Sequence, residues 1–360
     1  MELGIIGLPT SGKTTVFNAL TGSNRPTATA STGQLEVYSA VVDVPDERVD
    51  RLSALFKPRK TTYAKVTYTD IAGLDQGISQ SGISGQLRNR IATMDAFVHV
   101  IRAFQNDIVA HPMGSVDPQR DLNILDGETI LVDLMTTENR LERLAEGLKK
   151  GARGEERQTL QEQQELFQRL HETLESHLPL RDLDLTPEET GFLQGFGLLS
   201  LKPMLILLNT GEDLVPAENL VHYEHQQSAL TSLPGKLEME ISQLPPDEAE
   251  MFMKEFEIPE LGSSLVIQRS YDLVGLHSFF TVGEDEVRAW TVRRGANAVD
   301  AAGAIHSDLA RGFIRAEVIG YPELMAEGNM VAARKAGKVR LEGKEYIVQD
   351  GDILHVRFSV

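Results

Sequence analysis

Short apolar runs alternate with helical segments along the first half of the chain. The strand-like runs contain many β-branched and aromatic residues and lie at residues 2–7, 37–44, 63–70 and 96–101. A helix is predicted over Thr14–Thr21, directly after the first run. Residues 204–208, MLILL, are apolar throughout, as expected of a parallel strand that is buried on both faces. Strands that alternate with helices predict an α/β fold with a doubly wound sheet.

The pattern becomes helical between residues 126 and 178. Apolar residues recur there at helical spacing, at Leu141, Leu144, Leu148, Leu160, Phe167, Leu170 and Leu174. Gly151 and Gly154 separate the two halves of this region. We therefore predict a helical hairpin, a short antiparallel coiled coil, which is inserted into the α/β domain before the strand at residues 204–208.

A small α+β domain is predicted from about residue 276. Its expected strands are residues 289–292, 313–318, 340–348 and 353–358, and its expected short helix is residues 330–336. The last two strands are joined by the turn sequence QDGD. The predicted domains are therefore residues 1–125 together with 200–275, residues 126–199, and residues 276–360.

The composition fits a globular protein of several domains. The chain has 360 residues, of which 41 % are hydrophobic, enough for two or three domains of roughly 150 residues each. It has no cysteine, which excludes disulfides, thiolate metal sites and a cysteine nucleophile. The N-terminus does not resemble a signal peptide, and no run approaches the roughly 20 apolar residues that span a bilayer. We expect a cytoplasmic protein with no membrane partner.

The net charge of −18 argues against sequence-independent binding of nucleic acid by the whole surface. Residues 121–275 hold 12 basic and 30 acidic side chains, so the two ends of the chain are near neutral and can present basic faces. Candidate residues for such a face are Lys57, Arg59, Lys60, Arg293, Arg294, Arg334, Lys335 and Lys338. Scattered solvated charges are the alternative explanation.

Residues Gly7–Thr14, GLPTSGKT, form the G-x-x-x-x-G-K-[ST] phosphate loop, between a predicted strand and a predicted helix. The glycines let backbone N–H groups converge on phosphate oxygens at a helix N-terminus. Lys13 is expected to bridge the β- and γ-phosphates as a catalytic residue, and the Thr14 hydroxyl to bind Mg²⁺. The predicted nucleotide-binding residues of this loop are Pro9, Thr10, Ser11, Gly12, Lys13, Thr14 and Thr15.

A second motif, D-x-x-G, follows the strand at residues 63–70. Its carboxylate, Asp70, is expected to hold Mg²⁺, and the N–H of Gly73 to contact the γ-phosphate. Leu74 stands where Ras-type GTPases have the glutamine that orients the attacking water. Either another residue takes that role, or intrinsic turnover is slow and a partner stimulates it.

A third motif, Asn209-Thr210-Gly211-Glu212, directly follows the strand MLILL, where a GTPase carries N-K-x-D. The Asp of that motif accepts hydrogen bonds from two guanine donors. Glu212 places its carboxylate one methylene further out, which does not reproduce that geometry. Adenine has no 2-amino group, so discrimination between ATP and GTP is expected to relax or reverse.

These motifs, in this order, resemble the YchF/Obg-like ATPase family within the translation-factor class of P-loop NTPases. The resemblance runs nearly end to end and includes the segments GLPTSGKTTVFNALTG at 7–22, VPDERVDRL at 44–52, DIAGL at 70–74, GSVDPQRDL at 114–122, GKLEMEI at 235–241, SYDLVGLHSFFTVGEDEVRAWTVRRG at 270–295, AAGAIHSDLARGFIRAEVI at 301–319 and LEGKEYIVQDGDILHVRF at 341–358.

The resemblance implies a P-loop NTPase domain with an inserted helical domain, and a C-terminal TGS domain of the β-grasp type. It implies a preference for ATP, read from Asn209 and Glu212, and a base-binding loop that contains Gly235. It also implies catalysis by a loop histidine, and His111 is the matching residue. An ordinary histidine on a surface loop is the alternative interpretation of His111.

Two departures from the family pattern affect the predicted ion sites. The family usually has Asn at the position of Thr10, where that Asn is associated with K⁺, so dependence on K⁺ stays open. The family's switch-I threonine, a Mg²⁺ ligand, aligns with Gln34. Thr32 is the substitute predicted to bind the metal, and Thr29 lies nearby.

The predicted function is that of a nucleotide-switched ATPase with Mg²⁺ as cofactor, which hydrolyses ATP to ADP and phosphate. Its expected partners are ATP or GTP and ribosomal subunits or ribosomal RNA, in a role in translation or the stress response. We expect it to act as a monomer. A GTPase of the same fold and a regulatory binding module with incidental turnover are the alternatives. A small-molecule kinase would need an acceptor site, for which the sequence has no motif.

Overall fold

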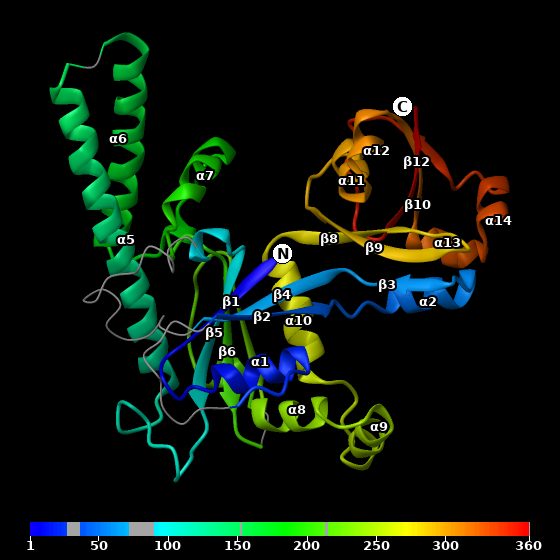
Figure 1. Cartoon of the computed structure of the whole chain (residues 1–360), viewed down its shortest axis with the longest axis horizontal. Helices are drawn as coiled ribbons and strands as arrows, with labels where there is room; N and C mark the ends of the chain where they lie inside the picture. Colours follow the sequence, from blue (N-terminus) through cyan, green and yellow to red (C-terminus); the bar gives the residue numbers. More distant parts are fainter. Residues whose placement is uncertain (27–36, 72–89, 152, 213–214, 360) are drawn as a thin grey trace. The chain divides into compact units, whose positions relative to one another are not determined.

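The computed structural model describes residues 1–26, 37–71, 90–151, 153–212 and 215–359 (Figure 1). The predicted site residues Thr32 and Gly73 lie outside these ranges, as do Thr29, Gln34 and Leu74. The chain divides into two compact units, one of residues 1–41 and 67–266 and the other of residues 42–66 and 267–360. In the described part of the chain, no helix is long and apolar enough to cross a membrane.

The sheet of the first unit has the strand order β2-β4-β1-β5-β6-β7. Its strands are β1 (Glu2–Ile6), β2 (Val37–Asp43), β4 (Lys65–Ile71), β5 (Ala96–Ala103), β6 (Met204–Thr210) and β7 (Ser228–Leu233). The pairs from β4 through β7 are parallel. In this strand order, β2 and β4 lie on one side of β1, and β5, β6 and β7 lie on the other. The loops after β1 and β5 therefore flank the switch point of a doubly wound sheet, where such folds bind ligands.

Both faces of this sheet are buried. In β6, Leu205 and Leu207 point to one face and Ile206 and Leu208 to the other, and all four are fully buried. Helix α5 (Pro118–Lys149) packs against β5, and α1 (Lys13–Thr21) packs against α8 (Gly235–Ser242). The remaining helical segments of this unit are α9 (Pro246–Glu255), the start of α10 (Gly262–Leu273), and the short η3 (Ala217–Asn219).

Two long helices occupy the region where a helical hairpin was expected. Helix α5 packs along α6 (Gly154–Glu175), and Leu144 of α5 shares a buried core with Phe167, Leu170 and Leu174 of α6. The short helices η1 (Leu180–Asp182), α7 (Pro187–Leu193) and η2 (Gln194–Phe196) follow. Helix α5 begins at Pro118 rather than near residue 126, because the Asp117 side chain caps it and proline suits its first turn. The coiled-coil geometry and the domain boundaries stay predictions.

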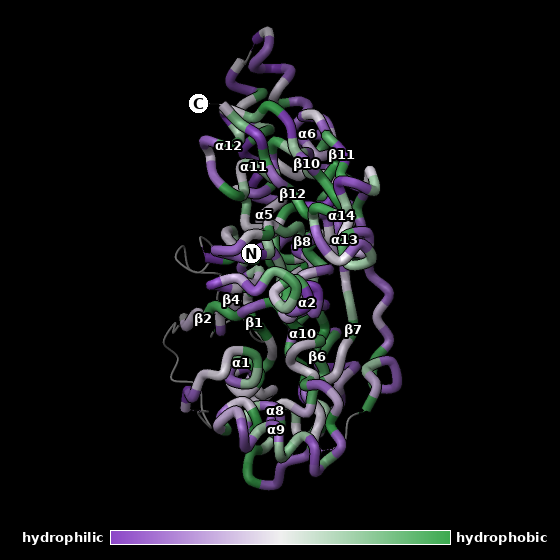
Figure 2. The backbone as a smooth tube through the Cα atoms, turned by 90° about the vertical axis from the view of Figure 1, so that its right-hand side faces the viewer, coloured by the Kyte–Doolittle hydropathy of each residue, from purple (hydrophilic) through white to green (hydrophobic). Residues whose placement is uncertain are grey.

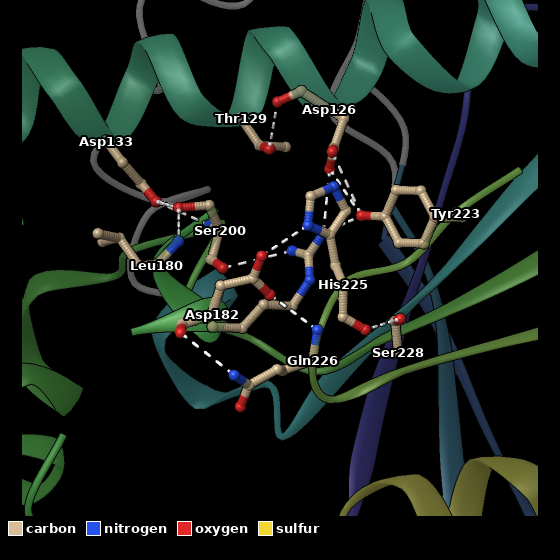
Figure 3. A network of polar contacts seen from close by, with 11 residues as sticks. Asp126, Thr129, Asp133, Leu180, Asp182, Ser200, Tyr223, His225, Gln226 and Ser228 are labelled. Carbon is tan, nitrogen blue, oxygen red and sulfur yellow. Dashed lines mark hydrogen bonds and ion pairs between the residues drawn. The ribbon is translucent and has the colours of Figure 1, made fainter. Parts of the chain in front are cut away.

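Buried polar side chains connect α5 to the loops that follow these helices (Figure 3). Arg181, which is 1 % exposed, donates to the Ser200 carbonyl oxygen at 3.3 Å and to Asp126 Oδ1 at 3.2 Å. Asp133, fully buried in α5, accepts hydrogen bonds from the backbone N–H of Ser200 at 2.7 Å and of Leu199 at 2.8 Å. These hydrogen bonds connect α5 to the segments around Arg181 and Ser200, although the buried Arg181 Nε has no hydrogen-bond partner among the described residues.

The second unit has a sheet of order β11-β10-β12-β8-β9-β3. Its strands are β3 (Lys60–Thr62), β8 (Leu276–Thr281), β9 (Glu286–Arg293), β10 (Phe313–Gly320), β11 (Arg340–Glu342) and β12 (Asp352–Phe358). Its helices are α2 (Glu47–Phe56), α11 (Ala298–Ile305), α12 (Ser307–Arg311), α13 (Tyr321–Glu327) and α14 (Met330–Lys335). Helix α2 is amphipathic, with Val49 and Leu52 buried, and its tube changes colour along its turns in Figure 2.

The expected strand over residues 340–348 is wrong. Strand β11 ends at Glu342, and β10 lies between β11 and β12, so no single turn joins two paired strands. The residues after Glu342 are held elsewhere. The N–H of Val348 donates to the Ala296 carbonyl oxygen at 3.0 Å, and Asp352 accepts from the Tyr346 hydroxyl at 2.7 Å.

Candidate functional site

The loop between β1 and α1 has the geometry of a phosphate-binding loop. Gly7 and Gly12 have φ of 153° and 93°, in the region that favours glycine. A Cβ on Gly12 would lie 2.1 Å from Asn209 Nδ2, and one on Gly7 would lie 2.3 Å from the Val100 carbonyl oxygen. Both positions therefore require glycine. The backbone of Thr10 is also in the left-handed region, at φ 62°.

The N-terminus of α1 is open to an anion. Gly12 caps this helix without a side-chain hydrogen bond, so the first N–H groups have no side-chain cap. The Lys13 ammonium bends back over the loop and donates to the carbonyl oxygens of Gly7 at 2.8 Å and Leu8 at 3.0 Å. A cation beside open helical N–H groups is an arrangement that binds phosphate.

Thr14 and Asp70 meet as the two motifs predict. Strand β4 is paired with β1, which puts Asp70 opposite Ile5, just before the loop. The Thr14 hydroxyl donates to Asp70 Oδ2 at 3.1 Å, and the Asp70 side chain is 8 % exposed. A hydroxyl and a carboxylate are oxygen donors that suit Mg²⁺, which usually takes its other ligands from phosphate and water. The residues present fit this metal.

Arg25, which sequence reasoning missed, shares the same carboxylate. Its Nη1 lies 2.8 Å from Asp70 Oδ2, and its Cζ lies 3.3 Å from the centre of the Tyr38 ring. The Asn18 side chain holds the Arg25 backbone by two hydrogen bonds. Asn18 Oδ1 accepts the Arg25 N–H at 3.1 Å, and Asn18 Nδ2 donates to the Arg25 carbonyl oxygen at 2.9 Å. A guanidinium therefore lies against the predicted metal carboxylate. No motif in the sequence marks Arg25, because the contact depends on the path of the chain after α1.

Asn209 connects two loops of the site. It is the second-last residue of β6, is 3 % exposed, and donates through Nδ2 to the Ser11 carbonyl oxygen at 2.9 Å. Its Oδ1 accepts the N–H of Gly235, the first residue of α8, at 3.2 Å. A Cβ on Gly235 would lie 2.6 Å from that oxygen, so this contact requires glycine. The third motif thus places Asn209 and Gly235 together with the phosphate loop.

The two positions that distinguish the third motif from N-K-x-D differ in exposure. Glu212 is exposed beyond the end of β6. Thr210, at the lysine position, is 3 % exposed, and its hydroxyl has no hydrogen-bond partner among the residues that the structure describes. A carboxylate at the edge of the loop can face a base, whereas Thr210 lies inside the protein.

His111 lies beside the phosphate loop, in a hollow that is too small to hold a water molecule. Its Nδ1 accepts the N–H of Met113 at 3.1 Å, so the ring proton is on Nε2, which lies 2.8 Å from Asp121 Oδ2. The His111 side chain is only 5 % exposed. The pocket is lined by Leu8, Pro9, Ser11, His99, Val100, Ile101, Arg102, His111 and Asp121. Sequence reasoning did not single out Asp121, which lies ten positions away on α5.

Two further side chains of this pocket belong to β5. Burial, together with the charges of Lys13 and Arg181, lowers the pKa of His99 to about 3, so this histidine stays neutral. Arg102 donates to Thr10 Oγ1 at 3.3 Å and to the Val109 carbonyl oxygen at 2.9 Å. It therefore ties the loop that carries His111 to the phosphate loop.

The family models divide the chain into two matched regions. Residues 2–140 match the family described as 50S ribosome-binding GTPase. Residues 276–359 match the YchF-GTPase_C family, described as a protein of unknown function (DUF933). The two matches place a nucleotide-binding region first and a distinct C-terminal region second.

Relatives match the chain over its whole length. It is 40 % identical to the ribosome-binding ATPase YchF of Bacillus subtilis, covering 100 % of both chains. It is 36 % identical to that of Pasteurella multocida, covering 100 % of this chain and 99 % of the relative. The solved structure of the Schizosaccharomyces pombe YchF GTPase matches with a TM-score of 0.78 and 30 % identity, covering 99 % of this chain and 97 % of that one. This identity over the full length shows that the chain belongs to the YchF family of P-loop nucleoside triphosphatases.

Proposed function

We propose that the protein is a nucleotide-switched ATPase, which hydrolyses ATP to ADP and phosphate and associates with ribosomal particles to regulate translation or the stress response. The observation that carries the proposal is the meeting of Lys13, Thr14 and Asp70 at one end of the parallel sheet. The relatives from B. subtilis and P. multocida are both described as ribosome-binding ATPases. We propose a cytoplasmic monomer.

The geometry of the phosphate loop supports the roles that we propose for its residues. Lys13 neutralises the β- and γ-phosphates, and the open N–H groups of α1 bind phosphate oxygens. Thr14 and Asp70 hold Mg²⁺, which neutralises charge on the phosphates when bound. Outside the described residues, Thr32 is proposed as a further metal ligand and Gly73 as a donor to the γ-phosphate.

His111 is proposed to position the attacking water. In the structure both ring nitrogens are engaged, Nδ1 by the Met113 N–H and Nε2 by Asp121. Neither nitrogen can accept a proton from water until one of these contacts opens. Release of Nδ1 from Met113 leaves a lone pair for water, while Asp121 stabilises the imidazolium that forms. The position of His111 close to Pro9 of the phosphate loop supports this role.

The preference for ATP is proposed from Glu212, whose carboxylate replaces the aspartate that recognises guanine. GTP is the second candidate substrate, because the S. pombe relative is described as a GTPase. Asn209 and Gly235 would shape the base site from the buried side.

Two measurements test the proposal. The first is phosphate release from ATP and from GTP at one Mg²⁺ concentration, where we expect ATP to give the higher kcat/KM. A higher value for GTP would establish the GTPase alternative. The second is co-sedimentation with ribosomal subunits in the presence of ADP, a non-hydrolysable ATP analogue or no nucleotide. We expect binding to depend on the nucleotide and ribosomal particles to stimulate turnover. Nucleotide-dependent binding without stimulation would favour the regulatory binding module.

A further inference from the structure

Helix α9 and the turn after it form an excursion of the first unit between α8 and α10 (Figure 1). The start of α10 is tied back to α8 by Glu238, which is only 5 % exposed. Its Oε1 accepts the N–H of Gly262 at 2.7 Å, and its Oε2 accepts the N–H of Ser263 at 3.2 Å. None of the ten residues of α9 is buried. Helix α9 therefore adds no side chain to the buried core.

The exposed side of α9 combines apolar and acidic side chains. Met251 is 71 % exposed, and Phe256, directly after the helix, is 60 % exposed. The Phe256 ring stacks on that of Phe252, with the ring centroids 4.4 Å apart. At about 3.6 residues per turn, Glu248 and Glu255 project between Met251 and the two phenylalanines. We name the surface formed by these five side chains the α9 face.

The end of α9 carries three features that cost stability locally. Glu255 is its last residue, where the partial negative charge of a helix C-terminus disfavours a carboxylate. Glu257 has φ of 53°, in the left-handed region that favours glycine. Phe256 exposes its ring to water. Departures of this kind from local preference are expected at functional sites, since a helix with only a structural role is more stable without them.

The surroundings of the α9 face are strongly acidic. Residues 246–260 contain six acidic side chains and one basic side chain, Lys254. In the described part of the chain, the carboxylates of Glu248 and Glu255 form no ion pair. These charges attract a cationic partner and repel nucleic acid. A guanidinium or ammonium group can also stack on the exposed ring of Phe256.

We propose that the α9 face binds a segment of another protein in which arginine or lysine residues are interspersed with apolar ones. The basic side chains pair with Glu248 and Glu255, and the apolar side chains cover Met251 and Phe256. Aromatic and methionine side chains are enriched in protein interfaces, and the flexible methionine adapts to the shape of a partner. The acidic rim steers basic partners to this surface and rejects acidic ones. The inference is independent of the nucleotide that the protein hydrolyses.

The test measures the binding of labelled synthetic peptides to the whole protein by fluorescence anisotropy. One peptide alternates arginine with leucine, a second alternates arginine with serine, and a third alternates glutamate with leucine. Thermal unfolding and basal phosphate release verify that each variant of the protein is folded. We expect the parent to bind the arginine–leucine peptide more tightly than either of the others. No binding of this peptide by the parent, or equal binding of the arginine–serine peptide, would overturn the proposal.

The apolar contact is tested with Phe256→Ser. Its matched control is Val331→Ser on α14, because both parent side chains are 60 % exposed. Phe256→Ser should weaken binding of the arginine–leucine peptide by about tenfold or more, since burial of a phenylalanine side chain stabilises a contact to that extent. The control should bind like the parent. Equal losses in the two variants would show that the peptide does not bind at the α9 face.

The charge is tested with Glu248→Gln combined with Glu255→Gln. The control combines Glu155→Gln and Glu156→Gln, which removes the same charge from exposed positions on α6. The first pair should weaken binding of both arginine peptides, by a factor that shrinks as the salt concentration rises, and the control should stay near the parent. Equal losses in the two pairs would indicate attraction to the net charge of the protein and contradict a site on α9.

Amide hydrogen exchange locates the contact along the chain. The arginine–leucine peptide should slow exchange in residues 246–258 of the parent and leave exchange in Phe256→Ser nearly unchanged. Protection confined to other segments would place the peptide elsewhere. Analytical ultracentrifugation of the parent and of Phe256→Ser tests the competing occupant, a second copy of the chain. Self-association of the parent that Phe256→Ser abolishes would assign the α9 face to that second copy and overturn the proposal.

Discussion

The guanidinium of Arg25 lies 2.8 Å from the carboxylate of Asp70, the residue that the D-x-x-G motif assigns to Mg²⁺. The same Asp70 oxygen accepts the Thr14 hydroxyl. A cation supplied by the chain thus stands where the proposed Mg²⁺ would be held. If Asp70 holds Mg²⁺ as proposed, Mg²⁺ and Arg25 compete for one carboxylate.

Replacing Arg25 by alanine should lower the Mg²⁺ concentration needed for half-maximal ATP binding. The expected change is a few-fold, because a partly exposed ion pair is worth about 1 kcal/mol or less. Calorimetric titration of ATP at several Mg²⁺ concentrations measures this directly. Arg25→Lys, which keeps the charge, serves as the control and should stay near the parent. An increased Mg²⁺ requirement in Arg25→Ala would instead make Arg25 a ligand-binding residue.

Lys13→Ala should abolish tight binding of the triphosphate or its turnover, because it removes the cation that faces the developing charge on the γ-phosphate. Lys150→Ala is a suitable control, since the Lys150 side chain is 78 % exposed and its ammonium lies 3.5 Å from Glu146 at the far end of α5. Phosphate release and ATP affinity are measured for both. Undiminished hydrolysis by the Lys13 variant would refute the assignment of the phosphate loop.

His111→Ala should slow ATP hydrolysis by about 10²–10⁴-fold if His111 acts as a general base, with nearly unchanged ATP affinity. The motive is its place in a pocket with the phosphate loop and the absence of a glutamine after the D-x-x-G motif. His222→Ala is the control, because the His222 side chain is 81 % exposed. Single-turnover rates separate chemistry from binding. A rate equal to that of the parent would leave His111 a structural partner of Asp121.

Glu212→Asp combined with Thr210→Lys restores the N-K-x-D pattern and should shift preference from ATP towards GTP. By analogy with bidentate base contacts in DNA recognition, worth about 1–3 kcal/mol, the affinity ratio should move roughly tenfold to a hundredfold. Thr210 is buried, so the new lysine has to turn outward and the shift can be partial. Glu212→Asp alone avoids this problem and is measured in parallel. An affinity ratio that stays constant in both variants would place base selection elsewhere.

The unfolding free energy of the parent protein minus that of Asp133→Asn should decrease as the pH rises from about 4 to about 6. Burial raises the pKa of Asp133 from 3.8 to about 6, so over this interval the folded protein binds more protons than the unfolded chain. The variant lacks this titration, so the difference in unfolding free energy should change by about 3 kcal/mol. Urea denaturation of both proteins at several pH values measures it. A pH-independent difference would contradict the role of burial.

The sequence predicted the parts of the site that local patterns encode. The phosphate loop follows β1, Asp70 and Asn209 lie near the ends of β4 and β6, and the parallel sheet brings these strand ends together. Arg25 and Asp121 escaped prediction because their contacts in the site depend on tertiary structure. Arg25 pairs with Asp70, which lies 45 positions away along the chain. The strand expected at residues 340–348 failed for a related reason. Its later residues are held by Ala296 and Asp352, and these contacts override the β-propensity of the run.

Asn209 gives the nucleotide site a fixed length. Its side-chain amide hydrogen-bonds to Ser11 of the phosphate loop and to Gly235 of α8 at the same time, which links these two parts directly. If the base binds beside Asn209 and Gly235 as proposed, the span from the base to the β-phosphate is set before any nucleotide arrives, and little ordering entropy is lost there on binding. ADP and ATP would share that span and be held by it equally. The ability to tell them apart has to reside on the side of the γ-phosphate, where Thr14, Asp70 and Arg25 meet.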